Sequence, residues 1–228
     1  MKNKLALLSA APLFAFAAAV QAVPVTYIAA DNSVSTLAGM VNSQAAAADF
    51  LSVAGALDVY DFESPEPSNL TITGGSTTNT PACGALCGFN TTAGGAFFRE
   101  LFGGSVSFSF TDPVDAFGFY VNGLQTDIVP QQTIEYVDGS SVTQTIDFPS
   151  ATGGGGAFVG FIDFGQLIAS VTFNATNDIL GFDDLRFGQS ANNPGDPVSV
   201  PEPGSIALLG IGLLGIGMTR RKKHSSVV

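Results

Sequence analysis

The sequence predicts a mainly β protein whose body is an antiparallel β-sandwich of jelly-roll type, with a closed barrel as the alternative. About nine short segments alternate apolar and polar residues between Gly- and Asn-rich turns, as is typical of such folds. The 228-residue chain also contains 19 Phe and no Trp. Phenylalanine is therefore expected to fill most of the core.

The clearest strand is 105–111, in which Val106, Phe108 and Phe110 face inward and the serines between them face outward. The pair Asp138-Gly139 lies between two other predicted strands and predicts a hairpin turn. The remaining predicted strands are 59–63, 70–73, 116–121, 132–137, 141–148, 157–164, 168–175 and 179–187. Residues 57–189 therefore form the predicted sandwich domain.

An Ala-rich stretch before these strands predicts the one helix of the body. Ser43 is the predicted N-cap of a helix over 44–54, and a short turn over 35–41 precedes it. We expect residues 23–56 to be a helical lead-in. Residues 74–95 are predicted to be a long polar loop. After the last strand, residues 190–199 contain Pro and Gly and are predicted to be an extended linker.

The first 22 residues have the pattern of a signal peptide. Lys2 and Lys4 precede an apolar stretch, and small residues lead to a predicted cleavage between Ala22 and Val23. Signal peptidase is the expected partner. An uncleaved N-terminal anchor is the alternative.

The last part of the chain, 200–224, combines three features in order. Val200, Pro201, Glu202 and Pro203 come first, and an uncharged apolar run follows. This run is slightly shorter than the roughly 20 residues that span a bilayer, but flanking residues can make up the difference. The basic cluster Arg220, Arg221, Lys222 and Lys223 then predicts a stop, with the C-terminus in the cytoplasm and the body outside.

Charge is distributed unevenly along the chain. All Lys and Arg residues except Arg99 and Arg186 lie near the two ends, whereas all 19 acidic residues except Glu202 lie in the body. Such an acidic body is a poor partner for nucleic acid, which needs clustered basic residues. The only histidine, His224, lies in the basic tail, so the body has no base for a Ser-His-Asp or Cys-His mechanism.

The two cysteines, Cys83 and Cys87, lie close together in the polar loop. Two thiols with no histidine nearby are too few for a metal site. Outside the cytoplasm a local disulfide is the simplest expectation, with free thiols as the alternative.

The Val-Pro-Glu-Pro element, the apolar run and the basic stop together resemble the PEP-CTERM sorting segment of Gram-negative bacteria. In that family a membrane-embedded exosortase cuts near the Pro-Glu-Pro element, whose two prolines keep it out of a helix. The resemblance implies export across the inner membrane, transient anchoring there, and a final place at the cell surface or outside the cell. A plain C-terminal membrane anchor is the alternative.

Residues 58–63 and 181–188 look like the first and last strands of exported jelly-roll domains, among them carbohydrate-binding modules. In those domains an early acidic residue and an Asp of the last strand share a structural Ca²⁺. The resemblance implies a possible calcium site made by Asp183 with Glu63 or Asp61, and no other cofactor. The alternative is that Asp183 and Asp184 accept hydrogen bonds from loop amides.

These observations predict an exported surface or matrix protein, structural or adhesive and associated with exopolysaccharide, as in a biofilm. A carbohydrate-binding module is the first alternative, and it needs exposed aromatic residues, for which Tyr60, Tyr120 and Tyr136 are the candidates. A glycoside hydrolase is the second, and it needs two carboxylates about 5–10 Å apart in a cleft. We expect no catalytic activity.

Overall fold

Strands make up most of the computed structural model, which describes residues 25–125, 131–148 and 153–191. The strands are β1 (Val25–Asp31), β2 (Asp58–Tyr60), β3 (Leu70–Thr73), β4 (Ser76–Thr78), β5 (Ala82–Ala85), β6 (Phe98–Val114), β7 (Ala116–Leu124), β8 (Gln131–Tyr136), β9 (Ser141–Thr145), β10 (Gly155–Ile162) and β11 (Ile168–Gly188). A 3₁₀-helix, η1 (Leu37–Gly39), precedes the α-helix α1 (Val41–Ala54). The predicted signal peptide, its cleavage site and the sorting segment lie outside the described residues.

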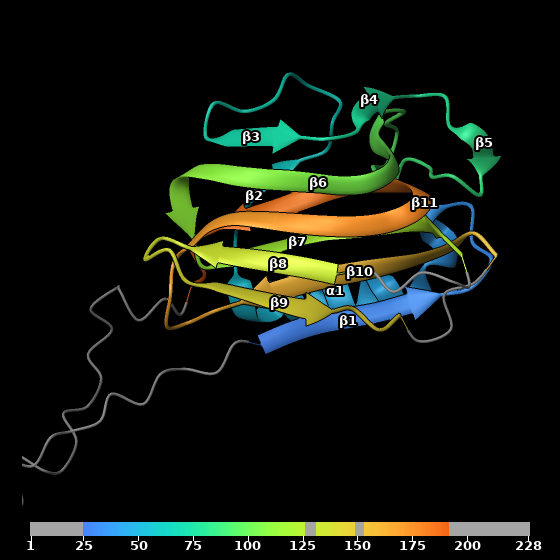
Figure 1. The fold of residues 1–228 in the computed structure, drawn as a ribbon. Helices are drawn as coiled ribbons and strands as arrows, with labels where there is room; N and C mark the ends of the chain where they lie inside the picture. The colour runs from blue at the N-terminus through green and yellow to red at the C-terminus, as the bar shows by residue number, and fades with distance from the viewer. Residues whose placement is uncertain (1–24, 126–130, 149–152, 192–228) are drawn as a thin grey trace, which may run out of the picture.

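Two long strands, β6 and β11, run through both layers of a curled antiparallel sheet (Figure 1). In the first layer they lie side by side, with β3 beyond β6 and with β8 and β9 beyond β11. In the second layer the later part of β11 pairs with β7, and β10 and β1 follow. The β-sandwich prediction is confirmed.

The change of layer coincides with irregular backbone in both long strands. The pairing of β11 with β6 shifts register around Thr176, which has a positive φ of 59°. Gly103 and Gly104 of β6 lie opposite this point and also have positive φ, which glycine adopts without steric cost. Such bulges bend a strand and increase its twist. The two strands predicted at 168–175 and 179–187 are therefore one bent strand.

Phenylalanine fills the space between the layers, as the composition predicts. Phe108, Phe119 and Phe173 are fully buried, and the ring centroids of Phe119 and Phe173 lie 5.8 Å apart. Val106 is buried beside them, while the serines of β6 lie on the other face. The alternation of apolar and polar residues along β6 therefore reflects the burial of one face of this strand.

Helix α1 covers the outer face of the second layer (Figure 1). Phe50 is fully buried there, 5.6 Å from the ring of Phe158 on β10. Gly160 leaves space for it, because a Cβ added at Gly160 would lie 3.0 Å from the Phe50 ring. Both faces of β7 and β10 are consequently covered, and every residue of these two strands is buried.

The predicted N-cap of the helix is wrong. Helix α1 begins at Val41, and Ser43 lies inside its first turn. The cap comes from the end of β1: the Asp31 carboxylate accepts the backbone N–H groups of Asn42 at 3.0 Å and Ser43 at 2.9 Å, and also the Ser43 hydroxyl at 2.7 Å. Burial raises the pKa of Asp31, but these hydrogen bonds outweigh it and lower the pKa overall.

Three strands were not predicted. Residues 25–31, which we placed in the helical lead-in, form β1 and pair with β10 along their whole length. Within the loop predicted at 74–95, the short β4 pairs with β6, and β5 carries the first cysteine. These segments are short or rich in Ala and Thr, so they lack the alternation that identified the other strands.

Candidate functional site

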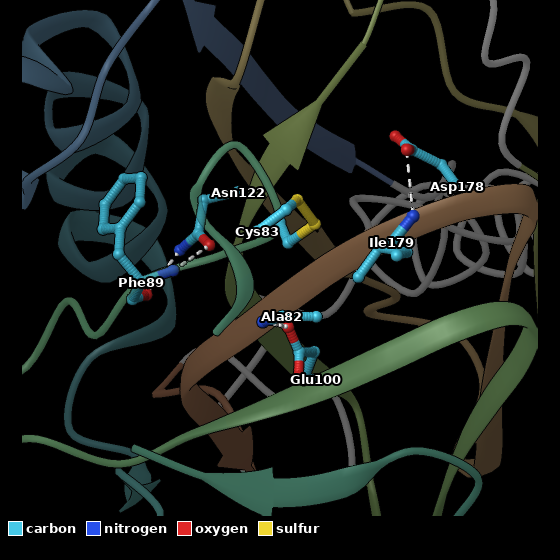
Figure 2. Close-up of a disulfide and its surroundings, with 8 residues drawn as sticks. Ala82, Cys83, Phe89, Glu100, Asn122, Asp178 and Ile179 are labelled. Carbon is cyan, nitrogen blue, oxygen red and sulfur yellow. Dashed lines mark hydrogen bonds between the residues drawn. A yellow bond between two sulfur atoms is a disulfide. The ribbon is translucent and has the colours of Figure 1, made fainter. Parts of the chain in front are cut away.

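The loop that carries the cysteines lies directly against the end of β7 and against residues 179–183 of β11. We call residues 82–97 the strap. Cys83 and Cys87 are joined by a disulfide with their Cα atoms 5.3 Å apart (Figure 2). Gly88 rests on Gly181 of β11: a Cβ added at Gly88 would lie 2.9 Å from the Gly181 Cα atom. The strap therefore packs on the sheet backbone itself.

Buried side chains of the sheet hold the strap in place. Asn122 of β7 is fully buried; its Oδ1 accepts the Phe89 N–H at 2.8 Å and its Nδ2 donates to the Phe89 carbonyl at 2.9 Å (Figure 2). On β6, Glu100 Oε1 accepts the Ala82 N–H at 2.8 Å. The backbone polar groups of the strap thus find partners without a full strand pairing.

Asp183, the first predicted calcium ligand, also binds the strap. Its Oδ2 accepts the backbone N–H and, at 3.0 Å, the hydroxyl of Thr91, and the Thr92 N–H lies 3.3 Å away. The side chain is fully buried, and this burial raises its pKa to about 7. The hydrogen bonds to Thr91 act in the opposite direction, and the charge of neighbouring Asp184 raises the pKa further.

The other two predicted calcium ligands do not join Asp183. Glu63 Oε1 accepts the N–H groups of Ala96 at 2.6 Å and Phe97 at 2.7 Å, and Asp61 Oδ1 accepts the Glu63 N–H at 3.1 Å. Across residues 25–125, 131–148 and 153–191, no three His, Cys, Asp or Glu residues form a group that would hold a metal ion. These three carboxylates do not come together as the implied calcium site requires, and Asp183 accepts hydrogen bonds from loop amides, as in the alternative. Calcium binding stays a prediction, which calorimetric titration of wild type and Asp183→Ala tests.

The three tyrosines that were the candidates for a sugar-binding platform are buried. Tyr60 is 6% exposed, Tyr120 is 5% exposed and Tyr136 is 3% exposed. Burial raises the pKa of Tyr120 to about 12. These side chains belong to the packed interior, so they do not form the exposed aromatic platform that the carbohydrate-binding alternative needs.

Two further buried carboxylates hold turns. Asp115 accepts the Ser190 N–H at 2.6 Å and its hydroxyl at 2.8 Å, which fixes the chain after β11. Asp163 Oδ1 accepts the N–H groups of Gly165 at 2.8 Å and Gln166 at 3.2 Å. Burial raises the pKa of Asp115, and the charge of Asp163 adds to this effect. Asp163 is also hydrogen-bonded to the Tyr136 side chain. Both carboxylates are thus engaged by turns and neighbouring side chains, so these two residues do not resemble the paired acid and nucleophile of a hydrolase.

A different surface distinguishes the first layer. In the paired segments 71–73 of β3, 105–109 of β6, 170–174 of β11, 131–135 of β8 and 141–145 of β9, the outward-facing residues are Ser or Thr except Asn174, Gln131 and Glu135, and we call this surface the hydroxyl face. The Ser and Thr members are Thr71, Thr73, Ser105, Ser107, Ser109, Thr133, Ser141, Thr143, Thr145, Ser170 and Thr172. All are exposed or half-buried, and none of these positions carries an aromatic or basic residue.

The strand registers arrange these residues in rows that cross the sheet. The central row takes one residue from each of five strands, and its order is Thr73, Ser107, Thr172, Thr133 and Thr143. Within it the hydroxyls of Ser107 and Thr172 lie 2.8 Å apart, and those of Thr133 and Thr143 lie 2.9 Å apart. In the next row the Ser170 hydroxyl donates to Glu135 at 3.1 Å. The outward serines of β6 were predicted, but the rows depend on pairing between distant segments.

Comparison with known proteins identifies the tail. The PEP-CTERM protein-sorting motif matches residues 199–222, and no curated protein matches the chain. Among solved structures, a family 29 carbohydrate binding module is 13% identical, with a TM-score of 0.36 over 63% of this chain and 98% of the other. The catalytic domain of a GH87 alpha-1,3-glucanase in complex with nigerose is 16% identical, with a TM-score of 0.35 over 61% of this chain and 29% of the other. These TM-scores are too low to bear on function.

The sorting motif indicates an exported protein that is sorted to the cell envelope, and it implies processing by an exosortase. Among the described residues no helix is long and apolar enough to cross a membrane. The apolar run predicted to do so falls within the matched tail, outside those residues.

Proposed function

We propose that the protein is a non-catalytic component of the cell surface or extracellular matrix that contacts exopolysaccharide through the hydroxyl face. The observation that carries this proposal is the alignment of Ser and Thr side chains across five paired strands. The sorting tail supports it, because the tail delivers the body to the envelope. Export from a Gram-negative cell and final release from the membrane belong to the same proposal.

The chemistry of the face suits a polymer rich in hydroxyl groups. Each Ser or Thr hydroxyl offers one donor and two acceptor lone pairs, so a paired hydroxyl still has capacity for a ligand. A single such hydrogen bond contributes only about 0.5–1.5 kcal/mol. Many bonds to one long chain add up to useful binding, whereas a single small sugar makes too few. A polymer is therefore the expected ligand, and no bond-breaking step is needed.

The test is co-sedimentation of the full chain, in mild detergent, with exopolysaccharide isolated from the producing bacterium. Wild type is expected to sediment with the polymer. The double variant Thr172→Glu with Thr133→Glu, in the centre of the face, should no longer sediment with the polymer. The added charge and bulk interrupt the rows of hydroxyls. Ser52→Glu, on the exposed side of α1, is the matched control and should sediment like wild type. Absence of wild-type binding would refute the proposed function.

A further inference from the structure

We propose that the hydroxyl face takes an uncharged polysaccharide in an extended conformation, lying across the strands along the rows. This inference rests on the proposed function and adds the class of polymer and its direction on the sheet. Charge, spacing and the hydrogen-bonding capacity of the rows support it separately.

The charge on the face excludes acidic polymers. Glu135 is its only charged residue, and the Ser170 hydroxyl already donates to it. Nearly all acidic residues of the chain lie in the surrounding body, where Arg99 and Arg186 are the only basic residues. A polyanion would be repelled by this field and would find no cation on the face to bind. A neutral polymer is not repelled by the acidic body and needs no cation on the face.

The spacing of the rows favours a chain that crosses the strands. Neighbouring strands lie about 4.8 Å apart, so a row presents one side chain at each such interval. This interval is close to the length of one sugar in an extended polysaccharide. Along a strand, outward residues recur only every ~6.7 Å, and the face is no more than three rows deep. A chain along a row therefore meets a polar side chain at each sugar.

Hydrogen bonds inside the central row hold its hydroxyls in place. Ser107 with Thr172, and Thr133 with Thr143, each form one hydrogen bond across adjacent strands. Each pair keeps one free donor and several free lone pairs. Side chains held by a neighbour lose less conformational entropy on binding than free ones. The row is thus partly preorganised for the donors and acceptors of sugar hydroxyls.

Native affinity electrophoresis of the full chain tests the polymer class. Hydroxyethyl cellulose, which is neutral, is expected to retard the protein, and alginate, which is acidic, is not. Thr172→Val with Thr133→Val keeps the shape and strand propensity but removes two hydroxyls, and it should reduce retardation at least fivefold. Thr26→Val, an exposed threonine on β1, is the matched control. Retardation by alginate alone would overturn this inference and leave the proposed function standing, whereas no retardation by either polymer, together with failed co-sedimentation, would refute both.

Competition by cello-oligosaccharides tests the direction of the chain. Each added sugar should tighten binding by roughly two- to fivefold until the row of five strands is spanned. The gain should then level off near five sugars. A plateau at two or three sugars would place the chain along the strands and contradict the arrangement proposed here.

Discussion

The Asn122 side chain makes the hydrogen bonds to the Phe89 backbone that a neighbouring strand would otherwise make. The Asp183 carboxylate does the same for the backbone N–H groups of Thr91 and Thr92. Both side chains are fully buried, where a polar group without a partner is costly. The Asn122 amide and the Asp183 carboxylate each supply the hydrogen-bonding groups that the backbone of the strap requires. At the scale of single residues, the polar groups buried beneath the strap hold it to the sheet.

Asn122→Ala is expected to lower the free energy of unfolding by about 2–4 kcal/mol. The change leaves the buried N–H and carbonyl of Phe89 unpaired, and each such group costs roughly 1–3 kcal/mol. Chemical denaturation measures the difference. Asn177→Ala, an exposed residue on β11, should change stability little. Equal losses in the two variants would contradict the role given to Asn122.

Asp183 should make the protein less stable as the pH rises. Its pKa is about 7 in the folded protein against an ordinary 3.8, so the fold favours the protonated form. The contribution of the protonated Asp183 carboxyl to the free energy of unfolding is fully present below about pH 4 and is lost as the pH rises through 7. The difference in unfolding free energy between wild type and Asp183→Asn should therefore fall from pH 4 to pH 8. Asp147→Asn, at an exposed carboxylate, is the matched control. A constant difference for Asp183→Asn would refute the assignment.

Helix α1 and the strap both pack on the second layer, where Phe89 of the strap joins the same hydrophobic cluster as Phe50, but the two elements are held differently. Helix α1 is attached through Phe50, Ala47 and Ala54, which are buried against the sheet. The strap is attached to the sheet through hydrogen bonds to the side chains of Asn122 and Asp183, whereas its disulfide joins two residues of the strap itself. Loss of one contact should therefore have different consequences in the two elements.

Phe50→Ala is expected to cost about 3–5 kcal/mol, because it leaves a cavity between α1 and β10 where the Phe158 ring and the Gly160 backbone cannot close in. Thermal and chemical denaturation give the loss. Ser52→Ala, exposed on the same helix, should be nearly neutral. A loss below about 1 kcal/mol for Phe50→Ala would mean that the helix is not anchored by this ring.

Removal of the disulfide in Cys83→Ala with Cys87→Ala should cost no more than about 2 kcal/mol, since the closed loop is short. The strap keeps its bonds to Asn122, Asp183 and Glu63. The double variant is thus expected to stay folded and to lose less stability than Asn122→Ala, as judged by denaturation and near-ultraviolet circular dichroism. Unfolding of the variant at room temperature would contradict this ranking.

On the scale of the whole molecule, the chain separates delivery from binding. The sorting motif lies at residues 199–222, after the last strand of the body. Nearly all basic residues lie in the terminal segments, so the body is acidic apart from the hydroxyl face. The body therefore carries the binding surface that we propose, and the tail carries the sorting signal.

Replacing Pro201, Glu202 and Pro203 with Ala is expected to block processing and retain the protein in the membrane fraction. The prolines keep the element extended, as a protease cleft requires. Mass spectrometry of the mature C-terminus and cell fractionation provide the readout. Pro194→Ala with Pro197→Ala in the linker is the control and should be processed normally. An unchanged C-terminus in the triple variant would refute recognition at this motif.

Much of the fold could be predicted because its signals are local. The alternation at 105–111 identified β6, and Asp138-Gly139 identified the β8–β9 hairpin, whose Gly139 has the positive φ expected there. Strand β1 was missed because its Ala residues give little contrast between its two faces. The helix cap was assigned to Ser43 because Asp31, its true source, lies on another element.

The sequence by itself determined the sandwich class, the phenylalanine core and the sorting tail, since each follows from composition or from residues close together in the chain. Only the tertiary structure decided that β6 and β11 pass through both layers, and that Asp183 binds Thr91, 92 residues away. It also decided that Ser and Thr residues of five strands form rows. These features depend on strand register and on contacts between distant segments, which the pattern within a single segment does not specify.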